Sequence, residues 1–79
     1  MEVVVGGKYK PFKGNLYKVI CIGYDTESDD EFPRKLVVYE SLYGEHKIWI
    51  RPYDMFISKV DKEKYPLVEQ EYRFEYIEE

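Results

Sequence analysis

The stretch Leu36–Phe56, which reads LVVYESLYGEHKIWIRPYDMF, limits the possible folds more than any other part of the chain. Two runs rich in β-branched and aromatic residues are separated by a short break at Gly44, and Pro52 stops the second run. Runs of this kind, joined by a short glycine-containing loop, are typical of an antiparallel β-hairpin. We therefore expect strands at Lys35–Tyr43 and Lys47–Arg51 to form the framework of the fold.

Further short runs of similar composition indicate that the rest of the chain is β as well. Leu16–Tyr24 is apolar on both alternating sets, and Tyr72–Ile77 alternates rings with charges. Met55–Val60 fits a strand or a short helical turn leading into one, and no segment repeats apolar residues with the helical period over three turns. The sequence predicts an all-β fold: a small SH3-like barrel or a rolled antiparallel sheet of five to six short strands.

The length of the chain, 79 residues, allows one domain over 1–79, with its core in 7–60 and a closing strand at 72–77. A domain this small buries little surface, and an aromatic content of 18% compensates in part because each ring buries a large area.

The net charge of −4 comes entirely from residues 61–79. Overall acidity argues against non-specific nucleic-acid binding, which depends on cations at phosphates. A deep catalytic cleft is hard to build at this size, whereas a shallow groove is not.

Alternation along the hairpin divides its side chains between two faces. One set is aliphatic, and we expect it to form the core: Leu36, Val38, Leu42, Ile48 and Ile50. The other set joins rings to an arginine and, with the turn that follows, forms the candidate binding site: Tyr39, Tyr43, Trp49, Arg51 and Tyr53. Tryptophan, tyrosine and arginine dominate binding hot spots. The alternative is structural, with Trp49 closing one end of the barrel and Arg51 paired with Asp54 or Glu40.

The chain offers little for catalysis or for a cofactor. Cys21 and His46 are its one cysteine and its one histidine, and Cys21 stands between two isoleucines, where we expect it to act as a small core hydrophobe. One histidine without a second at metal-ligand spacing is a weak metal signal. The acidic run after Asp25 begins like a calcium loop but has Asp30 and Leu36 where that motif needs glycine and glutamate. We expect no catalytic residues, no metal site and no cofactor, and hence a protein that is not an enzyme.

Several stretches of the chain carry a combination of motifs with a specific order and spacing. The most specific is Trp49-x-Arg51-Pro52-x-x-Met55-Phe56, which follows Leu-Tyr-Gly at 42–44. The others are Gly7-Lys8-Tyr9, Phe12-Lys13-Gly14 with Tyr17 and Val19, Val37-Val38-Tyr39, and Arg73-Phe74. Over most of 7–60 the order and spacing of these stretches resemble a family of small bacterial domains of unknown function, family 1653, and Arg73-Phe74 resembles the closing piece of that family.

The resemblance implies a stand-alone small β-domain without an established activity or ligand. Two positions depart from the family pattern, because Pro11 and Asp25 stand where members commonly have histidine. If either histidine carries chemistry in relatives, that chemistry is in doubt for this chain.

These observations favour a non-catalytic binding module whose aromatic-lined groove takes a peptide or protein partner. A nucleic-acid-binding barrel is the first alternative, with an acid-free strip of lysines supplying contacts to phosphates: Lys8, Lys10 and Lys13. A small hydrolase and a structural homo-oligomer are less favoured alternatives. We expect no membrane partner, a monomer or a weak homo-oligomer, and a cytoplasmic location.

Overall fold

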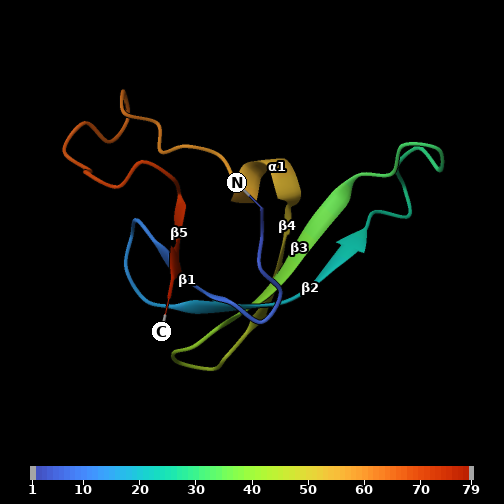
Figure 1. Ribbon diagram of the computed structural model, residues 1–79, viewed down its shortest axis with the longest axis horizontal. Coiled ribbons are helices and arrows are strands. Elements are labelled where there is room, and N and C mark those ends of the chain that lie inside the picture. The colour runs from blue at the N-terminus through green and yellow to red at the C-terminus, as the bar shows by residue number, and fades with distance from the viewer. Residues whose placement is uncertain (1, 79) are drawn as a thin grey trace.

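Five antiparallel strands form one open sheet in the computed structural model, which describes residues 2–78 (Figure 1). The order across the sheet is β4-β3-β2-β1-β5. The elements are β1 (Lys8–Pro11), β2 (Tyr17–Tyr24), β3 (Lys35–Ser41), β4 (Ile48–Pro52), the short helix α1 (Tyr53–Phe56) and β5 (Phe74–Ile77). The prediction of a small all-β fold is confirmed. Within residues 2–78, no helix has the length and apolar character needed to cross a membrane.

The β3–β4 hairpin forms where the sequence indicates it, and its register decides which side chains share a face. Tyr39 is paired with Trp49, and Val37 is paired with Arg51. The chain reverses in the loop between the strands, where Gly44 adopts a φ of 57°. Positive φ is readily adopted by glycine because it has no Cβ. The hairpin therefore places Trp49 and Arg51 on the same side of the sheet as Val37 and Tyr39.

Aromatic rings fill the core on that side of the sheet. The rings of Phe56 and Phe74 stack at 4.1 Å between centroids, and Tyr9 and Tyr39 each approach Phe56 edge-on at 5.3 Å. All four of these rings are buried, together with Val19 and Val37. Each large ring removes far more apolar area from water than an aliphatic side chain does, which is how so short a chain obtains a core.

The predicted assignment of the hairpin faces is wrong. The buried residues of β3 are Val37, Tyr39 and Ser41, and the aliphatic residues that alternate with them, Leu36 and Val38, are only partly buried. Leu42, beyond the strand, is partly buried as well. Ile48 and Ile50, expected in the core, are 56% and 64% exposed. Both alternating sets of β3 are apolar, so the pattern alone does not choose between them. The rings, which bury the larger area, take the inner side.

A β-bulge in β2 determines which residues of that strand face the core. The register shifts between Val19 and Cys21, which leaves Ile20 as the extra residue. Val19 pairs with the buried Tyr39 and is buried itself, whereas Cys21 is exposed. The prediction that Cys21 is a core hydrophobe is therefore wrong, because the bulge turns it to the outside. With Ile20, Val38, Ile48 and Ile50 it belongs to the outer face of the sheet.

The segment that joins α1 to β5 crosses back to the sheet as a long loop (Figure 1). The first residues of Met55–Val60 end helix α1, as the predicted helical turn has it, but no strand follows within this segment. An isolated bridge pairs Lys59 with Tyr72. The Gln70 side-chain amide donates to the backbone carbonyls of Lys10, Tyr72 and Arg73 at 2.8–3.3 Å. These hydrogen bonds fasten the loop to β1 and so position one wall of the pocket described next.

Candidate binding pocket

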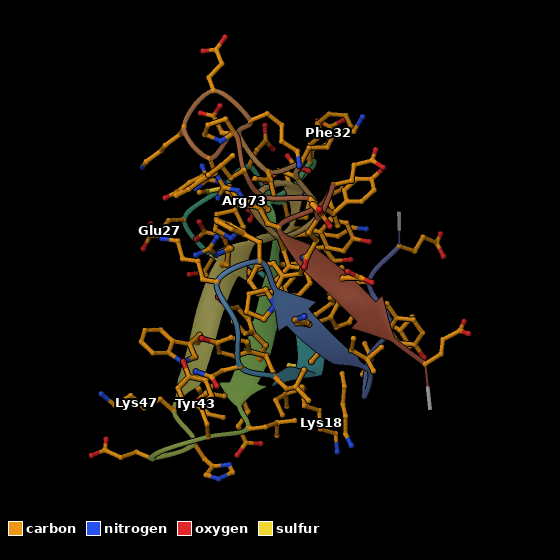
Figure 2. All side chains as sticks on the ribbon, turned by 90° about the vertical axis from the view of Figure 1, so that its left-hand side faces the viewer. Lys18, Glu27, Phe32, Tyr43, Lys47 and Arg73 are labelled. Carbon is orange, nitrogen blue, oxygen red and sulfur yellow. The ribbon has the colours of Figure 1, made fainter. Side chains whose placement is uncertain are left out.

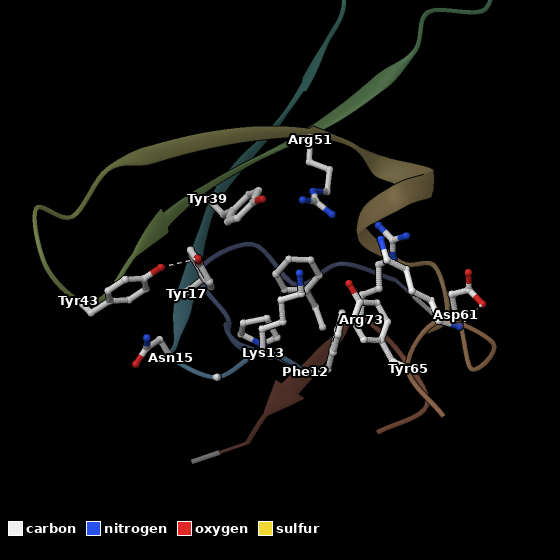
Figure 3. Close-up of a pocket in the computed structure, with 14 residues that line it drawn as sticks. Phe12, Lys13, Asn15, Tyr17, Tyr39, Tyr43, Arg51, Asp61, Tyr65 and Arg73 are labelled. Carbon is white, nitrogen blue, oxygen red and sulfur yellow. Dashed lines mark hydrogen bonds between the residues drawn. The ribbon is translucent and has the colours of Figure 1, made fainter. Parts of the chain in front are cut away.

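A pocket of about 580 Å³ opens on the core-facing side of the sheet, between the hairpin and the long loop (Figure 3). Its lining comes from β1 and the turn after it, from β2, from the hairpin, from residues 61–65 and from the start of β5. In Figure 2 Arg73 lies above Tyr43, and both of these residues line the pocket. The lining residues are Pro11, Phe12, Lys13, Gly14, Asn15, Tyr17, Tyr39, Tyr43, Arg51, Asp61, Lys64, Tyr65, Arg73 and Phe74.

One end of the pocket is formed by tyrosines in edge-on contact. The ring of Tyr17 lies 5.3 Å from that of Tyr39 and 5.7 Å from that of Tyr43. The hydroxyls of Tyr17 and Tyr43 share a hydrogen bond of 2.8 Å (Figure 3). Burial, and then the hydrogen bond with Tyr43, raise the pKa of Tyr17 to about 12. Tyr17 is therefore a neutral hydrogen-bonding group throughout the physiological pH range.

The opposite wall combines two rings with two lysines. Phe12 and Tyr65 lie 4.9 Å apart, and the Lys13 ammonium lies 5.5 Å from the centre of the Tyr65 ring. The Lys64 ammonium lies at the same distance from that ring. Lys13 at the Tyr65 hydroxyl, with a further contribution from Lys64, lowers the pKa of Tyr65 below its ordinary value of 10.0. The two ammonium groups beside this phenol make the local potential positive.

Four cationic side chains face the pocket against a single carboxylate. They are Lys13, Arg51, Lys64 and Arg73, and the carboxylate is Asp61. The Arg51 guanidinium lies 5.7 Å from the centre of the Phe74 ring, over a face that attracts cations. Asp61 is already engaged, because its Oδ1 accepts hydrogen bonds from the backbone N–H groups of Glu63 and Lys64. The pocket is thus positively charged in a protein whose net charge is −4.

Three of the five predicted binding residues meet in this pocket: Tyr39, Tyr43 and Arg51. Tyr39 is buried in its floor, whereas Tyr43 is 41% exposed at its rim. Lys13 joins them from the turn after β1. The structural alternative paired Arg51 with Asp54 or Glu40, yet within residues 2–78 no carboxylate lies at ion-pair distance from Arg51. Glu40 instead faces His46, with 3.7 Å between the Glu40 carboxylate and His46 Nδ1.

The structure does not bring Trp49 and Tyr53 into the same pocket. Trp49 is 43% exposed on the edge strand β4 and does not line the pocket. Tyr53 packs against the core, accepts a hydrogen bond from the Val3 N–H at 3.0 Å and lies under the Lys35 ammonium. It lines a second hollow, formed with Pro33, Arg34, Lys35, Pro52, Asp54 and Met55.

Lys8 and Lys10 do not line the pocket either. Both flank the buried Tyr9 in β1, and alternation along a strand turns them to the opposite face of the sheet. Of the three lysines predicted to contact phosphates, Lys13 alone is part of the pocket lining.

Sequence reasoning missed much of the pocket wall as site residues, namely Phe12, Tyr17, Asp61, Lys64, Tyr65, Arg73 and Phe74. The signal that could have found some of them is the motif pattern. Phe12, Lys13, Gly14, Tyr17, Arg73 and Phe74 all belong to the stretches that carry the family resemblance. Residues 61–65 stand outside those stretches, and their place beside the pocket follows from the path of the long loop.

The described part of the chain shows no arrangement with evident catalytic chemistry. Cys21 lies on the outer face of β2 and His46 in the β3–β4 loop, where His46 faces Glu40. Across residues 2–78, no three side chains among histidine, cysteine, aspartate and glutamate are grouped so as to hold a metal ion. The pocket presents rings, cations and hydroxyls around an open hollow.

The family described as "Protein of unknown function (DUF1653)" matches residues 7–76 of the chain, which include every lining residue of the pocket. The chain belongs to the DUF1653 family. The resemblance seen in the motifs is thereby confirmed. No curated protein matches the chain, and no solved structure matches it. Membership in DUF1653 assigns no activity, so the function has to be argued from the pocket.

Proposed function

We propose that this DUF1653 domain is a non-catalytic binding module whose pocket takes a segment of a peptide or protein partner. The observation that carries the proposal is the convergence of rings and cations from five separate segments of the chain on one hollow. Tyrosine and arginine are over-represented among residues that dominate binding energy, because both bury apolar area while they offer hydrogen bonds.

The shape of the pocket favours an extended ligand over a small compact one. It runs between the Tyr43 end and the Arg73 end, and its floor is made of ring edges and faces (Figures 2 and 3). Aromatic-lined grooves on small β-barrels bind extended peptides in this manner, and we propose that the sheet is SH3-like in this respect. We place this activity in the cytoplasm of bacteria, in line with the sequence resemblance.

The proposal is tested by selecting displayed random peptides on the intact chain. Two double variants of matched composition are compared with the wild type. Tyr43→Ala with Arg51→Gln alters the pocket, whereas Tyr24→Ala with Arg34→Gln removes the same residue types at exposed positions outside it. Selected peptides should lose affinity about tenfold or more for the pocket variant and should keep it for the control variant.

Circular dichroism and thermal unfolding of both variants show that the comparison concerns folded proteins. Peptides that bind both variants as well as the wild type would refute the proposed site. A selection that yields no binding peptide at all would refute the peptide-binding function itself.

A further inference from the structure

We infer that the pocket is specific for an acidic peptide, with two or more carboxylate side chains held by separate cations. This inference rests on the proposed function and adds the chemical class of the ligand. It comes from the charge of the pocket, from the spread of its cations and from the hydroxyl pair at one end.

The four cations of the pocket form no ion pair within residues 2–78, although the carboxylate of Asp61 also lines the pocket. The ion pairs present between residues 2 and 78 lie elsewhere: Arg34 with Asp25, Lys47 with Glu45, Lys59 with Glu71, and His46 with Glu40. None of them includes Lys13, Arg51, Lys64 or Arg73. The chain has sixteen acidic residues, yet within residues 2–78 none of them forms an ion pair with these four cations. A negatively charged ligand would compensate the excess positive charge of the pocket.

The cations come from three segments, which favours several single charges over one compact dianion. Arg51 extends from β4, Lys13 belongs to the turn after β1, and the long loop holds Lys64 and, directly before β5, Arg73. Figure 3 shows Arg51 and Arg73 on different stretches of the wall. A planar guanidinium matches the two oxygens of one carboxylate, so each arginine can hold a separate acidic side chain. The partly buried ring of Phe12 lies beside Lys13 and can pack against the apolar stem of a ligand side chain.

The Tyr17–Tyr43 pair supplies a directional contact at the other end. In a hydrogen bond between two hydroxyls, one hydroxyl donates and the other accepts, so one of the two hydrogens remains available. The pKa of Tyr17 is raised to about 12, so the Tyr17 hydroxyl stays protonated well above neutral pH. We assign it to a backbone carbonyl of the bound peptide.

A nucleic acid fits the charge distribution less well. Its binding strength depends on many cations along one track, and Lys8 and Lys10 lie on the opposite face of the sheet from the pocket. The net charge of −4 repels a polyanion beyond the pocket, whereas a short acidic segment meets mainly the local positive field.

The test uses three pools of short synthetic peptides with blocked ends and identical random positions. Fixed positions carry aspartate and glutamate in the first pool, asparagine and glutamine in the second, and lysine in the third. Backbone amide NMR signals of the intact chain are followed during titration at low and at high salt. We expect the acidic pool to bind about tenfold or more tightly than the amide pool at low salt, with the preference reduced at high salt. The lysine pool should not bind.

Two variants separate charge from shape. Arg51→Gln with Arg73→Gln should abolish the preference of the pocket for acidic over amide peptides. Lys47→Gln with Arg34→Gln removes the same net charge outside the pocket and should leave the preference intact.

Equal binding of the acidic and amide pools at the pocket would overturn the acidic specificity and leave the peptide-binding function standing. Tighter binding of phosphorylated peptides or of short single-stranded oligonucleotides than of the acidic pool would also overturn it. If no pool shifts any pocket signal and display selection also yields no ligand, the proposed function fails together with the inference.

Discussion

At the scale of single residues, Gly7 shows how little space the packing leaves. A Cβ placed on Gly7 would lie 2.8 Å from a ring carbon of Tyr76 and 2.9 Å from the backbone oxygen of Val4. The backbone oxygen cannot rotate away, so Gly7→Ala should destabilise the fold by about 1–3 kcal/mol. Chemical denaturation measures the change.

Gly23→Ala is the matched control, because no atom lies within 4 Å of its added Cβ. Alanine in the middle of a strand loses less backbone entropy than glycine, so this variant should be as stable as the wild type or slightly more stable. Equal loss of stability in the two variants would contradict the packing described around Gly7.

A second residue-scale prediction concerns the protonation of Tyr17. Its folded-state pKa, about 12, exceeds the ordinary value of 10.0. The stability that this shift contributes is fully present below pH 10 and is lost as pH rises through about 12, because the unfolded chain releases the proton first. Tyr43→Phe removes the hydrogen bond and should move the Tyr17 pKa toward its ordinary value.

Ring-carbon NMR shifts of Tyr17 against pH provide the measurement. They isolate this residue from Tyr9, whose pKa burial also raises. Tyr24→Phe, at an exposed position, should leave the Tyr17 titration unchanged. Wild-type Tyr17 titrating at its ordinary pKa would show that the hydrogen-bonded pair of Tyr17 and Tyr43 hydroxyls does not form.

Residue types indicated part of the pocket, and geometry decided the rest. Tyrosine and arginine in the hairpin pointed to Tyr39, Tyr43 and Arg51, which do line one pocket. The same reasoning grouped Trp49 and Tyr53 with them, because residue type and spacing do not show which rings pack against the core. Tyr53 is needed against the core, and Trp49 lies at the edge of the sheet.

At the scale of elements, the hairpin β3–β4 carries the clearest prediction. Val37 is fully buried on the inner side, whereas Ile50 is 64% exposed on the outer face. Val37→Ala should cost about 2 kcal/mol through lost burial and an unfilled space. Ile50→Thr keeps a β-branched side chain on the strand and should change stability by about 0.5 kcal/mol or less.

Thermal and chemical unfolding of the two variants test the face assignment. A larger loss of stability for Ile50→Thr than for Val37→Ala would contradict this face assignment and support the one predicted from the sequence. It would also remove Arg51 from the pocket, because Arg51 pairs with Val37 and shares its side of the sheet.

The sequence located strands better than it oriented them. β-branched and aromatic runs broken by glycine and proline marked β2, β3, β4 and β5 to within a few residues. Orientation was lost in β3 because Leu36 and Val38 are as apolar as Val37, so period-two alternation carried no contrast. In β2 the bulge at Ile20 interrupts the alternation of side chains, and no glycine at that position indicates a bulge in the sequence.

At the scale of the whole molecule, the pocket depends on contacts between distant parts of the chain. Gln70 donates to the Lys10 carbonyl, and through it the loop that holds Asp61, Lys64 and Tyr65 is fastened beside β1. Local patterns predict hairpins and turns, yet they carry no information about which loop closes over which strand. The sequence did not predict the positive charge of the pocket for the same reason, because two of its four cations belong to the most acidic segment of the chain.

The most direct test of the central claim is amide chemical-shift mapping of the intact chain with the tightest peptide from the display selection. We expect the largest shifts at Lys13, Asn15, Tyr43 and Arg51 and at the start of β5, which together surround the pocket. The outer face should stay unchanged, including Ile20 and Val38. Shifts confined to that face or to the hollow beside Tyr53, with the pocket signals unmoved, would contradict the claim that this pocket is the binding site.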